Sequence, residues 1–238
     1  MMLLRSLRAD FLKIRRKGIW FLVFLAPIGL VAMQGLNFGL RFDYLSKRYE
    51  DDLWGGLIYN IEQFIPMALF LGCTLISSLV ANVEHQMSSW KQLLALPVSR
   101  SAVFLAKFTL CVLVLAVSCL LLPILTAGLG LLLGFEPALP VQELLSMGFI
   151  PYLAAWPLLA LQLWLSLTFR NQALPVSIGV AAAILSPFTL DLSVWLPLNW
   201  ATLAMMDTSP VAYLLGGVSL SLFLLMISLL HFNRKDVD

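Results

Sequence analysis

The stretch that decides the fold is Ala102–Leu133, which reads AVFLAKFTLCVLVLAVSCLLLPILTAGLGLLL and contains a single charged residue, Lys107. An α-helix of about 20 apolar residues crosses the hydrocarbon core of a bilayer. At ~1.5 Å of rise per residue, this stretch is longer than one crossing requires. We therefore expect a membrane-spanning helix over 104–133 whose start lies in the interface.

The rest of the chain has the same character. Hydrophobic residues make up 61% of the 238 residues and charged residues 12%, with a mean hydropathy of +0.93, whereas a soluble domain carries about 25% charged residues. We predict an all-α integral membrane protein with one domain over 1–238, little of which is left for a soluble domain. Six transmembrane helices are expected at about 19–40, 60–81, 104–133, 147–169, 173–190 and 211–232.

Residues 1–18, before the first predicted span, are basic and amphipathic. Leu4, Leu7, Phe11 and Ile14 recur at helical spacing, and the stripe is flanked by six cations: Arg5, Arg8, Lys13, Arg15, Arg16 and Lys17. Such a helix lies in the headgroup layer near anionic lipid. The alternative is a charge cluster that only retains the N-terminus inside. A signal peptide is disfavoured because the following apolar run is too long and lacks a cleavage site.

The distribution of Lys and Arg predicts the topology. With both termini in the cytoplasm, the inner segments hold 12 of the 15 cations; these segments are 1–18, 82–107, 170–172 and 233–238. This asymmetry satisfies the positive-inside rule. Trp54, Trp195 and Trp200 then fall at the outer interface, where amphipathic rings prefer to lie. We expect a multi-pass protein of the cell membrane.

Motifs for catalysis or nucleotide binding are missing from the sequence. It has no GxxxxGK[ST], GxGxxG, HExxH or GxSxG motif, and its only histidines are His85 and His231. Cys73, Cys111 and Cys119 lie in apolar runs and are interpreted as packing residues. An intramembrane enzyme or an ion-coupled transporter needs ionisable groups within its spans, and these spans are nearly free of them. We therefore expect no enzyme, no metal site and no cofactor in this chain.

A few polar residues are the candidates for substrate contact. They are Gln34, Asn37, Glu62 and Gln162. For Glu62 the alternative is an interfacial carboxylate that reaches headgroups or water. Two glycine pairs, Gly35-x-x-x-Gly39 and Gly130-x-x-x-Gly134, are of the kind that allows close helix approach.

The segment between the second and third predicted spans reads VEHQMSSWKQLLALPVSRSAVFLAK over residues 83–107. Trp90, Leu93, Leu94 and Pro97 stand at i, i+3, i+4 and i+7, which is one apolar face of a short helix. On the cytoplasmic side such a helix suits insertion into the groove of a partner protein. A helix lying on the membrane surface is the alternative.

This segment resembles the type-2 permeases of ATP-binding-cassette (ABC) transporters. The matching residues are Glu84, Leu93, Leu94, Pro97, Val98, Ser99, Arg100 and Lys107. The basic N-terminal helix, and six spans with both ends inside, also match. In size and style the chain is most similar to exporters of bacitracin-like and lantibiotic peptides, including the immunity permeases of producers.

The resemblance implies a pair of permease chains, identical or homologous, and two copies of a separate ATPase subunit that binds ATP and Mg²⁺. It implies coupling to the ATPase through Glu84, Trp90, Lys91, Leu93, Leu94, Pro97 and Arg100. Because the spans are nearly free of charge, we expect an amphiphilic or peptide-like substrate. A membrane assembly or interaction protein that transports nothing is the alternative.

Overall fold

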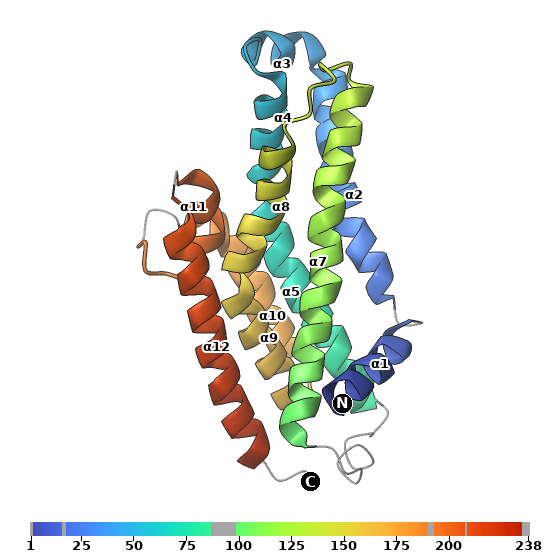
Figure 1. The fold of residues 1–238 in the computed structure, drawn as a ribbon, viewed down its shortest axis with the longest axis vertical. Coiled ribbons are helices and arrows are strands. Elements are labelled where there is room, and N and C mark those ends of the chain that lie inside the picture. The colour runs from blue at the N-terminus through green and yellow to red at the C-terminus, as the bar shows by residue number, and fades with distance from the viewer. Residues whose placement is uncertain (1, 16–17, 87–98, 190–192, 208, 235–238) are drawn as a thin grey trace.

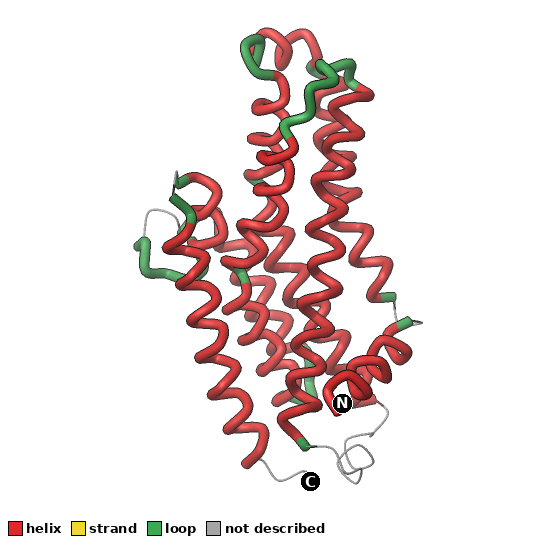
Figure 2. The backbone as a smooth tube through the Cα atoms, viewed as in Figure 1, coloured by secondary structure: helices red, strands yellow, loops and turns green. Residues whose placement is uncertain are grey.

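The computed structural model describes residues 2–15, 18–86, 99–189, 193–207 and 209–234. Within these ranges every regular element is a helix and no strand occurs (Figures 1 and 2). The predicted all-α class is therefore confirmed for the part of the chain that the structure describes.

Four described helices are long and apolar enough to cross a membrane. They are α2 (Ile19–Leu40), α5 (Ile65–Gln86), α7 (Arg100–Leu132) and α12 (Val211–Arg234). Three of them overlap the spans expected at 19–40, 104–133 and 211–232. The long helix expected at 60–81 begins only at Ile65, because a separate helix, α4 (Leu53–Glu62), ends just before it.

The fourth and fifth expected spans differ from single straight helices. Residues 147–169 fall on two helices, α8 (Val141–Ala154) and α9 (Trp156–Thr168), which are bent by 47° and count as a fifth span if taken together. Pro157 explains the break, because proline has no N–H for the helical ladder and clashes with the preceding turn. The next segment, α10 (Ala173–Leu185) with the 3-10 turn η1 (Ser186–Phe188), is apolar but shorter. A count of six spans stays a prediction.

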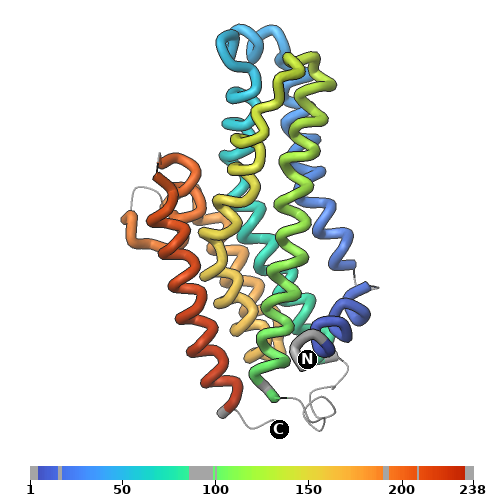
Figure 3. Tube along the Cα trace, viewed as in Figure 1, coloured from blue at the N-terminus to red at the C-terminus, as the bar shows by residue number. Residues whose placement is uncertain are grey.

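The helices α1 (Met2–Ile14), the end of α5, the start of α7 and the end of α12 lie together at one end of the molecule, which we call the base (Figures 1 and 3). The short helices α3 (Phe42–Arg48) and α4 lie at the far end, and α11 (Trp200–Met206) lies beside the start of α12. The chain thus begins and ends on one side of the bundle, as the predicted topology requires. Which side of the membrane this is stays a prediction.

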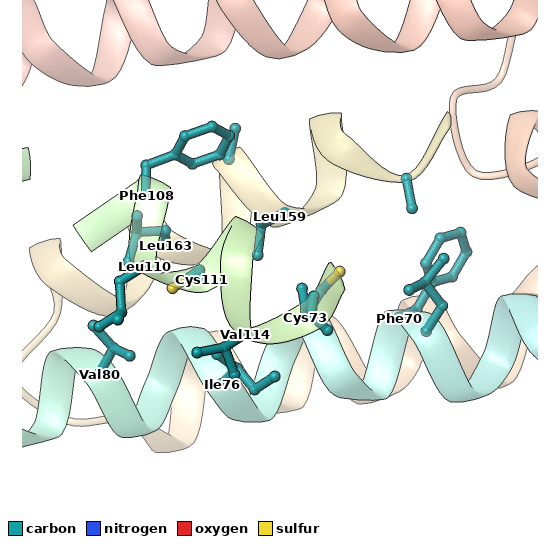
Figure 4. Packing of buried hydrophobic residues seen from close by; sticks show 14 of the residues in the cluster. Phe70, Cys73, Ile76, Val80, Phe108, Leu110, Cys111, Val114, Leu159 and Leu163 are labelled. Atoms are coloured by element: carbon teal, nitrogen blue, oxygen red, sulfur yellow. The ribbon is translucent and has the colours of Figure 1, made fainter. Parts of the chain in front are cut away.

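A hydrophobic core joins α5, α7 and α9 (Figure 4). Cys73, Cys111 and Cys119 are free thiols buried in this core, as the interpretation of packing residues requires. A smaller cluster at the far end is built around Trp54 and Phe135, whose ring centroids are 5.4 Å apart. The Trp54 ring lies on Gly130, where a Cβ atom would come within 2.3 Å of it. Gly130 thus admits an aromatic ring, whereas Gly39 and Gly134 have no neighbour this close.

Candidate functional site

Four charged side chains from three helices meet at the base. Asp10 and Lys13 come from α1, Glu84 from the last turn of α5, and Lys107 from the third turn of α7. The Nζ atom of Lys107 lies 2.9 Å from Oε1 of Glu84 and 3.3 Å from Oδ1 of Asp10. Lys13 Nζ reaches the same oxygen of Glu84 at 2.8 Å. We call these four residues the base cluster.

Three members of the base cluster are buried, whereas the side chain of Lys13 is 29% exposed. Glu84 is 0% exposed and Lys107 is 1% exposed. Isolated buried charges are very unfavourable, and they persist only when paired and hydrogen-bonded. Two carboxylates and two ammonium groups balance each other here. Burial raises the pKa of Asp10 above its ordinary value of 3.8, and the Lys107 ammonium opposes that rise.

Local sequence explains how α1 contributes to the cluster. Leu7, Asp10 and Ile14 stand at i, i+3 and i+7 and therefore share one helix face. Leu7 packs against the core, and Ile14 is 2% exposed. Leu7, Phe11 and Ile14 of the predicted apolar stripe thus face the bundle, and Asp10 lies on the same helix face. Gly18, with φ 74°, adopts the left-handed conformation that glycine favours just before α2 begins.

The position of Glu84 on its helix also requires compensating positive charge. It stands near the C-terminus of α5, where the helix dipole disfavours negative charge. The two lysines supply the compensation that the helix itself does not. Removing either lysine would leave the buried Glu84 carboxylate with one cation instead of two.

In sequence, Glu84 precedes the segment 87–98 and Lys107 follows it. This segment lies outside the described residues. Two residues separate Glu84 from this segment, and α7 begins after it at Arg100. Ser99 caps α7, with its Oγ accepting a hydrogen bond from the Ala102 N–H at 3.3 Å. Five of the predicted coupling residues fall in the undescribed segment: Trp90, Lys91, Leu93, Leu94 and Pro97. The backbone of Arg100 starts α7, and its side chain is not described.

A second set of contacts holds the end of α5 from the other side. One ring nitrogen of His85 lies 3.0 Å from the Ser166 carbonyl oxygen, and Gln172 Nε2 donates to the same oxygen at 2.9 Å. Ser78 Oγ donates to Gln172 Oε1 at 3.1 Å. The end of α5 is therefore tied by charges to α1 and α7 and by neutral hydrogen bonds to the α9–α10 turn.

Of the predicted substrate-contact residues, Gln34 and Asn37 contact each other on α2, whereas Glu62 and Gln162 lie on other helices. Gln34 is buried and donates from Nε2 to the Asn60 carbonyl at 3.1 Å, and Asn37 donates to Gln34 Oε1 at 3.1 Å. Glu62 ends α4 and is half-buried. Their role in substrate contact stays a prediction.

Gln162 is fully buried between α9 and α10. With the amide in its better orientation, its nitrogen donates to the Pro175 carbonyl and its oxygen accepts from the Gly179 N–H, both at 3.1 Å. Its amide therefore links two helices by bonding to backbone. A role for Gln162 in substrate contact also stays a prediction.

The family model described as ABC-2 family transporter protein matches residues 6–186, which is more than half of the chain. The chain belongs to the ABC-2 transporter family. The match includes all four residues of the base cluster. No curated protein matches the chain. Members of the ABC-2 family are membrane transport components that work with an ABC ATPase subunit and are normally not catalytic themselves. The type-2 permease resemblance is thus confirmed at the level of the family.

Asp10 and Lys13 are the parts of the site that the sequence analysis missed. Lys13 was counted as one cation among six, and Asp10 was not singled out. The usable signal was an acid at the centre of the apolar stripe of an amphipathic helix, together with Lys107 in a span that is otherwise uncharged. Both are costly unless each finds an opposite charge.

Proposed function

We propose that this ABC-2 family chain is the membrane permease subunit of an ABC exporter, and that the base cluster transmits the motion of the ATPase to the helices. One observation carries the proposal: Glu84 is fully buried, is separated from the segment 87–98 by two residues only, and is ion-paired to both α1 and α7. A displacement of that segment would act on three helices at once. ATP and Mg²⁺ are bound by the ATPase subunit, of which the working complex holds two copies.

The coupling residues have distinct proposed roles. Trp90, Leu93 and Leu94 anchor the segment in a groove of the ATPase, with Lys91 beside them, and Pro97 sets the angle at which the chain returns toward α7. Glu84 and Arg100 hold the two ends. A second permease chain, identical or homologous, completes the path.

The proposed substrate is an amphiphilic or peptide-like molecule, such as an antimicrobial peptide against which the exporter confers immunity. The absence of ionisable side chains from most of the described spans supports this class, because a hydrophilic ion would meet few partners along the path. The interior amides Gln34 and Gln162 are also engaged with backbone groups of the chain itself.

The test is co-purification with the cognate ATPase and measurement of ATP hydrolysis. We expect Trp90→Ala/Leu94→Ala to abolish binding of the ATPase. We expect Glu84→Gln to retain binding of the ATPase but to lose the stimulation of ATP hydrolysis by substrate. The substitution weakens the ion pairs that connect the end of α5 to α1 and α7. Lys47→Ala, on exposed α3, is the control and should change neither. Full binding by the Trp90→Ala/Leu94→Ala chain would contradict the proposal, and binding without any transport would favour the assembly or interaction protein.

A further inference from the structure

An apolar groove runs between α2 and α5 along one side of the bundle. Its volume is about 510 Å³, and α7 forms its floor between Leu115 and Leu122. Ser118 carries the one hydroxyl among its described lining residues. Leu25, at its side, is 48% exposed. The groove therefore opens sideways and offers nothing to a polar guest.

The length of the groove matches one leaflet of a bilayer. On α2 it extends from Leu22 to Met33, a rise of about 16 Å at ~1.5 Å per residue. The hydrocarbon core of a bilayer is about 30 Å thick, so that each leaflet contributes about 15 Å. An acyl chain that starts at the base would therefore fill the groove from end to end.

The groove closes at the end away from the base. Directly beyond Met33, Gln34 donates to the Asn60 carbonyl. One turn later Phe38 is buried against Phe135, with ring centroids 6.1 Å apart. A guest is thus limited to one leaflet and has its polar end at the base.

One described cation, Arg15, closely precedes the base end of the groove in sequence. Arg15 is exposed and stands seven residues before Leu22, the first groove residue on α2. In sequence, Arg16 and Lys17 follow it directly. An anionic headgroup near this connection would be attracted by ~1 kcal/mol per cation at a membrane surface.

From the leaflet-length fit, the closed far end and the exposed Arg15 just before α2, we infer that this groove binds one acyl chain of an anionic phospholipid, with its headgroup at Arg15. The site would hold a lipid of the leaflet that surrounds α1. It is independent of ATPase binding, so that its failure and the failure of the proposed function can be told apart.

The experiment is native mass spectrometry of the full chain released from nanodiscs of equimolar phosphatidylglycerol and phosphatidylcholine. We expect the wild type to retain one phosphatidylglycerol per chain. Gly29→Trp places a ring in the groove at a position with open space. It should lower retention about tenfold, the factor for displacing about two methylene groups at ~0.8 kcal/mol each. Gly39→Trp, also in open space on α2 but outside the groove, is the matched control and should retain the lipid.

Two further variants test the two parts of the site. Arg15→Gln should reduce the preference for phosphatidylglycerol about fivefold, the factor that ~1 kcal/mol corresponds to. Ala68→Leu narrows the groove from the α5 side and should repeat the loss if Gly29→Trp does not fold. Retention of both lipids in the bulk ratio, or equal retention by Gly29→Trp and wild type, would overturn the inference. So would a disulfide between two copies of the Leu25→Cys chain in native membranes, because a second copy would then cover the groove.

Discussion

The base and the far end of the bundle are held together by different kinds of interaction. At the base, three buried charges and the partly exposed Lys13, from α1, α5 and α7, neutralise one another. The far end is stabilised by aromatic packing and hydrogen bonds between uncharged groups. Trp54 packs against Phe135, and its Nε1 donates to the Glu136 carbonyl at 3.0 Å. Removing one apolar contact removes only the contribution of that contact to stability. Removing one member of a buried ion-pair network also destabilises the other members, because their charges are no longer neutralised.

The difference shows where a small displacement has a large effect. A small shift of one helix at the far end changes the packing energy gradually. A shift of α5 at the base separates Glu84 from two cations together. The end of the molecule at which α5 ends and α7 begins is thus the end whose energy is most sensitive to movement.

The largest expected effect is at the base. Lys107→Met leaves Asp10 and Glu84 without their shared buried cation, and we expect a loss of about 3–5 kcal/mol in unfolding free energy. Thermal unfolding in detergent micelles measures it. Lys47→Met, on exposed α3, is the control and should change the midpoint little. An unchanged midpoint for Lys107→Met would show that water or lipid headgroups reach the cluster.

At the far end the sharpest test is Gly130→Ala. The added methyl group would meet the Trp54 ring at 2.3 Å, so the ring must move. Overpacking of this kind costs about 1–3 kcal/mol. Gly128→Ala, on the same helix but in open space, is the matched control; it should be neutral or stabilising, because alanine favours a helix over glycine by about 0.5–1 kcal/mol. Equal midpoints for the two variants would contradict the packing described here.

The smallest expected effect concerns a single hydrogen bond at the far end. Trp54→Phe keeps an aromatic ring beside Phe135 but removes the Nε1 donor that bonds to the Glu136 carbonyl. We expect a loss of about 0.5–1.5 kcal/mol in unfolding free energy, the net contribution of one such hydrogen bond. Trp195→Phe, at a side chain that is 87% exposed, is the control for the same change of residue type. Equal thermal midpoints for the two variants would show that the Trp54 hydrogen bond contributes nothing.

Sequence reasoning reached the helical class and much of the helix layout. Hydropathy alone located α2, α7 and α12, because a run of about 20 apolar residues is typical of a membrane-spanning helix. It failed at the bend between α8 and α9, because a proline in an apolar run does not reveal how far the helix turns. It also missed the break between Glu62 and Ile65, which lies inside the segment that was expected to be one continuous helix.

The candidate site was predictable only in part. Glu84 and Lys107 were found through their positions in a family pattern, while their partners on α1 depend on how that helix folds back onto the bundle. Sequence spacing gives the apolar face of α1 but not the surface it meets. The segment with Trp90 and Leu94 was singled out from its periodicity, and its coupling role stays a prediction.

The base cluster also has a consequence for how the protein is made. Asp10 and Glu84 are both synthesised before Lys107. A lysine at the centre of an entering helix opposes membrane insertion by about 2.5–3.5 kcal/mol, and Lys107, near the start of α7, opposes it by less than that. When α7 leaves the ribosome, however, both carboxylates are already in place on earlier segments of the nascent chain. The order of translation therefore supplies the counter-ions first, and we expect insertion of α7 to depend on the helices that precede it.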